Sequence, residues 1–367
     1  MSSIPLVDLK AQYAPLAEEL KAGFARICAE ASFVLGPEVL AFEKEYAAFC
    51  EVKHVIGVAN GTEALELAVR ALGLGAGDEV LVPANSFIAS ALAVARAGAA
   101  VVLVDSDSDH LMDVEQAKKR LTPRTRAIMP VHLFGQVAPM GPILELAKRH
   151  GLAVIEDAAQ SQGAKQAGRN AGAFGAVTGT SFYPGKNLGA YGDGGAVLTN
   201  DDELAKKLRA LRNYGSEVKY HHPEMGFNSR LDSMQAMVLR VKLPHLAGYN
   251  AKRRAAASRY HALLEGVPGV LRPREVPGNE HIWHIYAVQV RDRDRVLKAM
   301  NQAGVGAGIH YPVPIHLQGA FAHLGHKKGD FPTAEKAANE MISLPIYPEI
   351  TPAQQEQVVA ALRAALA

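Results

Sequence analysis

The chain has 367 residues, 49% hydrophobic and 21% charged, so it can bury a large core, and we expect two domains in one unit. Its 39 basic and 37 acidic residues leave a formal net charge of +2, which gives no electrostatic argument for binding nucleic acid or a membrane surface. The first residues have no basic segment followed by an apolar one, and no apolar run reaches the ~18 residues of a membrane span, so a cytoplasmic location is expected.

Apolar segments alternate with helix-periodic segments between residues 55 and 200. Several apolar segments are continuous, which is typical of strands covered on both faces, as in a parallel sheet. The repetition predicts an α/β fold with a mostly parallel sheet of about seven strands flanked by helices. The expected strands are 55–58, 79–83, 100–104, 127–131, 153–156, 179–183 and 195–199, and the helices between them are 63–72, 86–95, 114–120 and 142–150.

The rest of the chain is first helical and then mixed. Residues 202–264 have a helical pattern with a break at 220–229, and a long helix over 233–260 is interrupted near Pro244. After a Pro/Gly cluster, we expect a strand over 284–290 and helices over 292–303 and 352–366. The pattern therefore predicts a large domain over residues 1–245, with an N-terminal arm, and a smaller C-terminal α/β domain over residues 246–367.

Two segments have the residue types of a binding site at the ends of strands. In residues 59–65 (ANGTEAL) a strand ends and a helix begins, so free N–H groups at Gly61 and Thr62 can bind an anion. The same pattern also fits an ordinary helix N-cap, which is the more frequent role. Asp157 follows a buried strand, where ligands bind in open α/β sheets, although a helix-capping role fits it equally well.

Lys186 lies in residues 181–189 (SFYPGKNLG), on an expected tight turn between a Pro-Gly pair and a glycine. A lysine on a loop is usually a solvated surface charge. Burial between apolar walls instead lowers the pKa of a lysine and frees a nucleophilic amine that can attack an aldehyde. With an anion site and an acidic strand end earlier in the chain, we favour the reactive amine. The two cysteines, Cys28 and Cys50, have no metal-binding spacing, so we expect reduced thiols and no metal site.

These motifs, taken in order, resemble the DegT/DnrJ/StrS family of nucleotide-sugar aminotransferases, which are pyridoxal phosphate (PLP) enzymes of fold type I. The resemblance runs from residues 5–9 to residues 343–348 and is closest to the 3-keto-sugar aminotransferases. Its motifs are residues 60–64 (NGTEA), 83–90 (PANSFIAS), 156–161 (EDAAQS), 181–195 and 226–235 (GFNSRLDSMQ).

The resemblance implies two catalytic residues. Lys186 would bind PLP covalently through its amine, and Asp157 would pair with the pyridine nitrogen and keep it protonated. The other cofactor contacts that it implies are Gln160 at the phenolic oxygen, Phe87 on the ring face, and Gly61, Thr62, Ser181 and Asn228 at the phosphate. Because Asn228 matches a residue that reaches the phosphate from the neighbouring subunit, the resemblance implies a homodimer with shared active sites.

Residues 308–318 (GIHYPVPIHLQ) hold two histidines and a tyrosine on a backbone stiffened by prolines. A histidine is more often structural than functional, but this segment resembles the part of the family's small domain that closes over the sugar. We therefore expect substrate contacts from His310, Tyr311, His316, Tyr183 and Arg230. For Arg230 a surface ion pair remains an alternative to binding a diphosphate, and His132, which follows another strand, fits a structural role as well as a pocket.

The expected activity is PLP-dependent transamination of a nucleotide-linked keto sugar, with L-glutamate as amino donor and pyridoxamine phosphate as the second form of the cofactor. A dTDP-linked 3-keto-6-deoxyhexose is the preferred acceptor, and UDP-linked 3-keto sugars and 4-keto sugars are alternatives. A sugar dehydratase is a further alternative, although family members with that activity have a histidine in place of Lys186. A non-enzymatic sugar-binding regulator is the last one.

Overall fold

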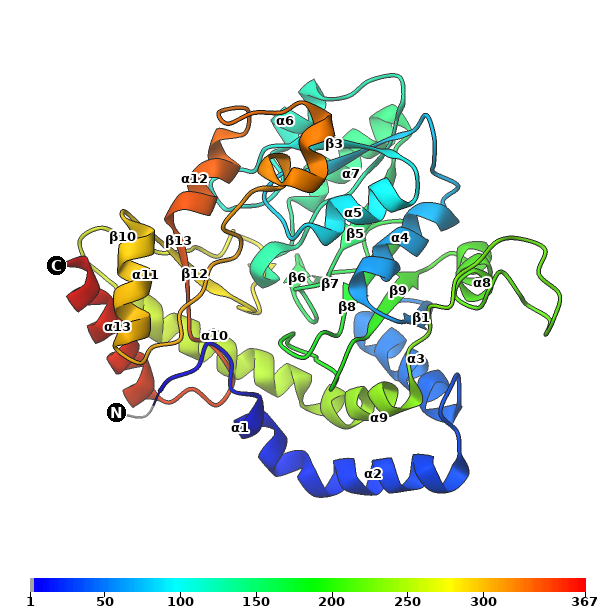
Figure 1. Ribbon diagram of the computed structural model, residues 1–367, viewed down its shortest axis with the longest axis horizontal. Helices are drawn as coiled ribbons and strands as arrows, with labels where there is room; N and C mark the ends of the chain where they lie inside the picture. Colours follow the sequence, from blue (N-terminus) through cyan, green and yellow to red (C-terminus); the bar gives the residue numbers. More distant parts are fainter. Residues whose placement is uncertain (1–2) are drawn as a thin grey trace.

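The computed structural model describes residues 3–367, so residues 1 and 2 of the expected large domain lie outside the described residues. Its centre is a seven-stranded sheet in the order β1-β9-β8-β5-β4-β2-β3 (Figure 1). The strands are β1 (His54–Val58), β2 (Glu79–Pro83), β3 (Ala100–Val104), β4 (Thr125–Ile128), β5 (Ala153–Asp157), β8 (Val177–Ser181) and β9 (Gly195–Thr199). Only β9 runs against its neighbours, β1 and β8, so the predicted mostly parallel sheet is confirmed.

Helices cover both faces of this sheet. Successive strand residues join different clusters: Val80 and Val82 pack with one layer of helices and Leu81 with the other, as expected of strands buried on both sides. The first layer contains α4 (Gly61–Ala71), α5 (Ala89–Arg96) and α8 (Asp202–Leu211), and the second contains α3 (Pro37–Cys50), α6 (Val114–Lys119) and α7 (Met140–His150).

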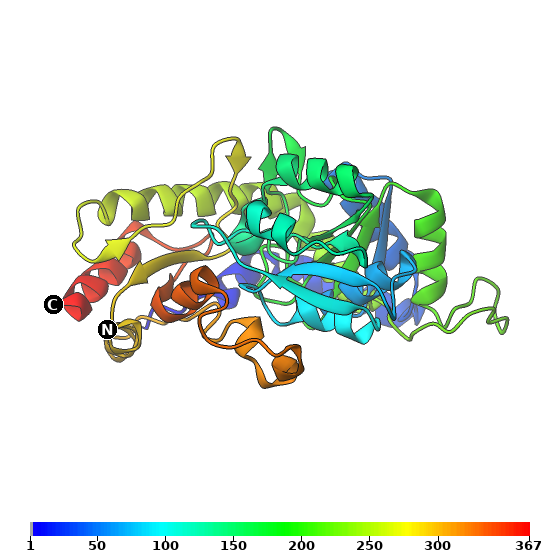
Figure 2. The same cartoon turned by 90° about the horizontal axis from the view of Figure 1, so that it is seen from above.

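The C-terminal part forms a smaller α/β unit with a core of its own. Its antiparallel sheet has the order β10 (Val270–Leu271), β12 (Tyr286–Val290) and β13 (Met341–Leu344). Helices α11 (Arg293–Gln302), α12 (Pro332–Glu340) and α13 (Pro352–Leu366) accompany it. The long helix α10 (Leu246–Leu263) leads into this unit from α9 (Ser233–Lys242) (Figure 2). The predicted interruption near Pro244 is a single 3-10 turn, Leu243–His245.

The N-terminal segment crosses to the small unit. Ile4 donates to the carbonyl oxygen of Gly304 at 2.9 Å and accepts from the N–H of Gly306 at 2.8 Å. The chain then continues through α1 (Leu9–Tyr13) and α2 (Ala17–Glu30), which runs along α9 below the sheet in Figure 1. Leu6 and Val7 are thereby held at the junction of the two units.

Several predicted boundaries are wrong by two or three residues. The strand expected at 127–131 ends at Ile128, and Pro130 has no N–H to continue a ladder. The strand expected at 179–183 is β8 and ends at Ser181, before the tight turn that carries Lys186. The helix expected from residue 86 begins at Ala89, and the strand expected from residue 284 begins at Tyr286. A small three-stranded sheet of β11 (Asn279–Glu280), β6 (Lys165–Gln166) and β7 (Arg169–Asn170) was not predicted.

Both cysteines are free: Cys28 is exposed and Cys50 is buried. Within residues 3–367, no group of three or more metal-ligating side chains is placed to hold a metal ion. No helix in the same range is both long and apolar enough to cross a lipid bilayer.

Candidate active site

A cavity of about 590 Å³ lies between the carboxyl ends of the central strands and the small unit. Ten of the thirteen predicted site residues line it: Gly61, Thr62, Phe87, Asp157, Gln160, Ser181, Tyr183, Lys186, His310 and Tyr311. The small unit and the N-terminal segment complete the wall with His284, Ile285, Ser343, Leu344, Leu6 and Val7, among others. The cavity is therefore built from both units.

Lys186 projects into this cavity from a tight turn. Its own N–H donates to the carbonyl oxygen of Tyr183 at 2.8 Å, which closes the turn. Gly189 is required after it, because a Cβ at that position would lie 2.3 Å from the carbonyl oxygen of Pro184. Burial lowers the pKa of Lys186 to about 8, and the nearby negative charge of Asp157 partly opposes this shift. A lysine with this pKa has a substantial fraction of neutral, nucleophilic amine close to neutral pH.

Asp157 ends β5 and is buried. Its Oδ2 accepts the hydroxyl of Ser90 at 2.7 Å, and its Oδ1 accepts the N–H of Ala159 at 3.1 Å. Burial raises the pKa of Asp157, while the hydrogen bond from Ser90 and the charge of Lys186 act in the opposite direction. The sequence contained Ser90 within a recognised motif, but nothing in its local pattern linked it to a carboxylate 67 residues away.

The start of α4 meets the end of β8 at the cavity wall. Asn60 caps the helix, since its side chain accepts the N–H of Glu63 at 2.9 Å, so the expected N-cap is present. The N–H groups of Gly61 and Thr62 precede this cap bond and have no partner within the helix. A Cβ on Gly61 would lie 2.6 Å from Cβ of Ser181, so only glycine allows the two elements to approach this closely. The result is an open helix N-terminus beside a serine hydroxyl, which suits an anion.

Gln160 connects the two units across the cavity. Its Oε1 accepts the N–H of Phe134 at 2.7 Å, which orients the amide so that Nε2 donates to the hydroxyl of Tyr311 at 3.0 Å. The ring of Tyr311 lies 5.3 Å from the ring of Phe87, centroid to centroid, at an angle of 41°. Phe87 is half exposed and stands at the rim, so these aromatic rings form one side of the cavity.

The predicted histidines separate into two groups. His310 lines the cavity, where burial lowers its pKa to about 4, and its Nδ1 is 2.8 Å from the hydroxyl of Ser343. His316 does not line the cavity. It is buried, with Nε2 3.0 Å from a carboxylate oxygen of Glu335. His132 is structural: its Nε2 lies 2.8 Å from Oε2 of the buried Glu156.

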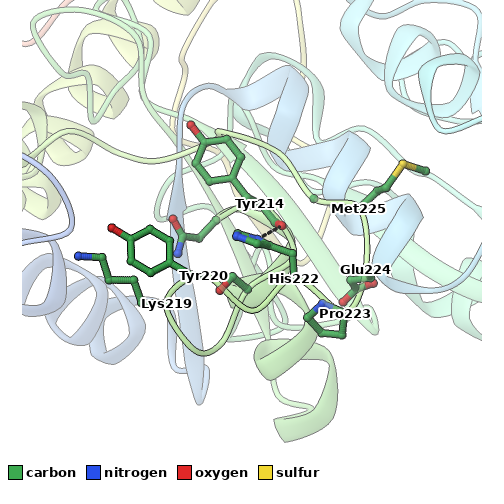
Figure 3. Close-up of a pocket in the computed structure, with 10 residues that line it drawn as sticks. Tyr214, Lys219, Tyr220, His222, Pro223, Glu224 and Met225 are labelled. Atoms are coloured by element: carbon green, nitrogen blue, oxygen red, sulfur yellow. Dashed lines mark hydrogen bonds between the residues drawn. The ribbon is translucent and has the colours of Figure 1, made fainter.

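Asn228 and Arg230 also lie outside the cavity of this chain. Asn228 is exposed, and Arg230 stacks over the ring of Tyr214 at 5.5 Å. Both follow a loop, residues 213–226, that projects from the large unit after α8 (Figure 1) and surrounds a second, open cavity of about 860 Å³ (Figure 3). Tyr220 and Met225 on this loop are 81% and 95% exposed. The loop thus presents two large, mostly exposed side chains on its surface.

Known proteins match the chain over nearly its whole length. The profile of the DegT/DnrJ/EryC1/StrS aminotransferase family matches residues 15–363. The dTDP-3-amino-3,4,6-trideoxy-alpha-D-glucose transaminase of Streptomyces venezuelae is 48% identical over 361 residues, which are 98% of this chain and 95% of that protein. The UDP-N-acetyl-3-dehydro-alpha-D-glucosamine 3-aminotransferase of Acidithiobacillus ferrooxidans is 46% identical over 366 residues, 100% of this chain and 98% of that protein. Among solved structures, S. venezuelae DesV in complex with a ketimine intermediate superposes with a TM-score of 0.97 at 47% identity and covers 99% of this chain and 98% of its own.

Proposed function

The chain belongs to the DegT/DnrJ/EryC1/StrS aminotransferase family, and from this premise we propose that it transfers an amino group from L-glutamate to a keto sugar linked to a nucleoside diphosphate. Lys186 is the observation that carries the proposal. It is the amine in the cavity whose pKa is lowered to about 8, and it lies near a buried carboxylate, Asp157. A surface charge would need neither the burial nor the glycine-dependent turn that supports it.

The residues around Lys186 fit PLP by their chemistry. The open N-terminus of α4, the glycine at position 61 and the Ser181 hydroxyl suit a phosphate dianion. Asp157, buried and still accepting two hydrogen bonds, suits a protonated ring nitrogen. Gln160 and Phe87 provide an amide and a flat apolar face in the same cavity. When bound, PLP supplies an electron sink that stabilises negative charge at the carbon that loses a proton.

The side chains of the protein provide binding and proton transfer. Asp157 would hold the proton on the ring nitrogen, and Ser90 holds Asp157. Lys186, when its amine is free, would remove a proton from the α-carbon of the amino donor in the first half-reaction and deliver a proton to the former keto carbon of the sugar in the second, acting as general base and then as general acid. The hydrogen bond from Gln160 to Tyr311 keeps the small unit against the large one and limits the entry of water.

The preferred acceptor is a dTDP-linked 3-keto-6-deoxyhexose. The relative from S. venezuelae is named for a dTDP-3-amino sugar and the relative from A. ferrooxidans for amination of a UDP-linked 3-dehydro sugar, so the likeness favours carbon 3 over carbon 4. The preference for dTDP follows the relative with the higher identity, 48% against 46%. Tyr183, His310 and Tyr311 are the side chains of the cavity wall that we assign to the sugar.

A half-reaction tests the function directly. The purified protein is treated with L-glutamate until the visible absorbance of the lysine-bound cofactor disappears, and 3-keto or 4-keto sugars carrying dTDP or UDP are then offered one at a time. We expect the absorbance to return with the dTDP-linked 3-keto sugar. A return with the 4-keto sugar alone would refute the preferred acceptor. Consumption of sugar by Lys186→Ala without an amino donor would instead indicate a dehydratase.

We further propose a homodimer in which Asn228 reaches the phosphate site of the neighbouring subunit. The exposure of Asn228 and of the adjacent loop supports this assignment. Mixed dimers of Lys186→Ala and Asn228→Leu subunits contain one site with both changes and one site with neither. Since random pairing makes about half of the dimers mixed, coexpression should restore about a quarter of the wild-type activity, and purified mixed dimers should have about half, whereas each variant alone should have little. Failure of the mixture to exceed either variant would refute the shared site.

A further inference from the structure

His284 lines the cavity but has no role in the function proposed above. It lies just before β12, in a stretch that joins the small unit to the large one, since the neighbouring Ile282 donates its N–H to the carbonyl oxygen of Gly135 at 3.0 Å. Its Nδ1 is 3.1 Å from Oδ1 of Asn187, the residue that follows Lys186. Within residues 3–367 this is the one hydrogen bond of the His284 side chain, and Nε2 of the partly exposed ring has no partner there.

A chain of hydrogen bonds fixes which nitrogen of His284 carries the proton. Nδ2 of Asn250 donates to the carbonyl oxygen of Gln162 at 2.9 Å, and a carbonyl oxygen can only accept, so Oδ1 of Asn250 is an acceptor. Nδ2 of Asn187 donates to that Oδ1 at 2.8 Å and also to the carbonyl oxygen of Ile282 at 3.2 Å. Oδ1 of Asn187 must therefore accept, and Nδ1 of His284 must donate to it.

Burial and the charges around His284 keep the ring neutral. Burial holds its pKa well below the usual range, and the positive charges of Lys186 and Arg253 and the neighbouring imidazole of His310 act in the same direction. A neutral imidazole with its proton on Nδ1 has an unprotonated Nε2. Since Nδ1 is committed to Asn187, Nε2 is a hydrogen-bond acceptor at the cavity wall over the physiological pH range.

We propose that His284 is a positioning residue for Lys186: its Nε2 accepts a hydrogen bond from the Lys186 amine whenever that amine is free. The inference rests on the proposed role of Lys186 in the transfer reaction. Both atoms belong to residues that line the same cavity, and neither has a hydrogen-bond partner within the described range, residues 3–367. The Lys186 amine can only donate when it is protonated, and Nε2 of His284 can only accept.

The alternative partner of the amine is Asp157, the carboxylate whose negative charge raises the pKa of Lys186 against the effect of burial. In the proposed function, Asp157 is engaged with the ring nitrogen of the cofactor. The neutral Nε2 of His284 also differs from a carboxylate in its effect on the lysine. It stabilises the ammonium form of Lys186 only modestly and leaves the pKa of Lys186 near neutrality, where the amine can act as both base and acid.

Competitive acylation measures the amine without measuring catalysis. The holoprotein is loaded with L-glutamate so that Lys186 is free, then labelled with trace acetic anhydride between pH 6 and 11, and each lysine is quantified by peptide mass mapping. We expect His284→Leu to lower the pH of half-reactivity of Lys186 by about one pH unit, and His284→Gln, which keeps an acceptor, to restore most of the shift. Lys53, whose side chain is 61% exposed and therefore open to the reagent, serves as the internal reference, and its labelling profile should not move.

The exposed His323 provides the matched control, because His323→Leu removes an imidazole outside the cavity and should leave the Lys186 profile unchanged. An unchanged profile in folded His284→Leu overturns the inference. If glutamate does not release Lys186 from the cofactor, the proposed function has failed instead. The imidazole is then still tested in wild-type protein by ¹⁵N NMR of labelled histidine, where a proton on Nε2 of His284 overturns the inference and a proton on Nδ1 alone supports it.

Discussion

Replacing Ser90 by alanine tests whether Asp157 works as the structure suggests. The Ser90 hydroxyl is the only described donor to Oδ2 of Asp157, at 2.7 Å, and Ser90 is fully buried, so no water replaces it easily. A hydrogen bond to a charged group contributes about 1.5–3 kcal/mol. Its loss should therefore raise the pKa of the Asp157 carboxyl group by roughly one to two pH units. Ser90→Ala should therefore weaken the carboxylate that holds the ring nitrogen.

The same free energy, lost from the transition state, lowers the rate of the glutamate half-reaction by roughly 10- to 100-fold. Stopped-flow absorbance measures this rate. The acid limb of its pH–rate profile should move to higher pH because Asp157 is protonated more readily. Ser86→Ala is the matched control. The hydroxyl of Ser86 lies 2.8 Å from that of Ser90, one step further from Asp157, so its loss should cost at most a few-fold. A rate within two-fold of wild type in folded Ser90→Ala would refute the reasoning.

Three further predictions concern the frame of the site. Gly61→Ala should weaken cofactor binding at least about ten-fold, because its Cβ would lie 2.6 Å from Cβ of Ser181; equilibrium dialysis measures this, and an unchanged affinity contradicts it. Burial lowers the pKa of Lys242 from 10.5 to about 8, so between these pH values the unfolded chain binds more protons and stability rises with pH. The thermal midpoint of Lys242→Met should lack this rise, and an identical pH profile contradicts it. Arg212→Met should cost about 3–5 kcal/mol in urea unfolding, because Glu43 is left as an unpaired buried charge. Changing both Arg212 and Glu43 to Met should recover most of that loss, and an Arg212→Met variant as stable as wild type contradicts the prediction.

The sequence predicted the residues whose roles depend on nearby positions. Lys186 on its turn and Asp157 at its strand end each have a local signature, namely a Pro-Gly pair and a buried apolar run. Ser90 and His284 have no such signature. Each acts through a contact with a residue distant in sequence, 67 residues away for Ser90 and 97 residues away for His284, and only the fold brings those partners together.

His310 and His316 illustrate the same limit on a single loop. They are six residues apart with two prolines between them, and the sequence placed both near the sugar. In the structure His310 lines the cavity, whereas His316 packs against Phe331, 4.6 Å from ring to ring, and pairs with Glu335. The partner of His316 is Glu335 in α12 and that of His310 is Ser343 in β13, and no pattern in the loop encodes either contact. The seven central strands and the helices expected between them, in contrast, followed from periodicity alone.

The N-terminal segment has a practical consequence for anyone who expresses this protein. Ile4 is held on both sides by the small unit, and the next residues, Leu6 and Val7, are part of the cavity wall. A purification tag fused directly in front of Ile4 would begin two residues before Leu6, and a change that replaced residues 3–7 would remove Leu6 and Val7 from the wall. Screening of acceptor sugars is therefore best done with a tag that is removed completely.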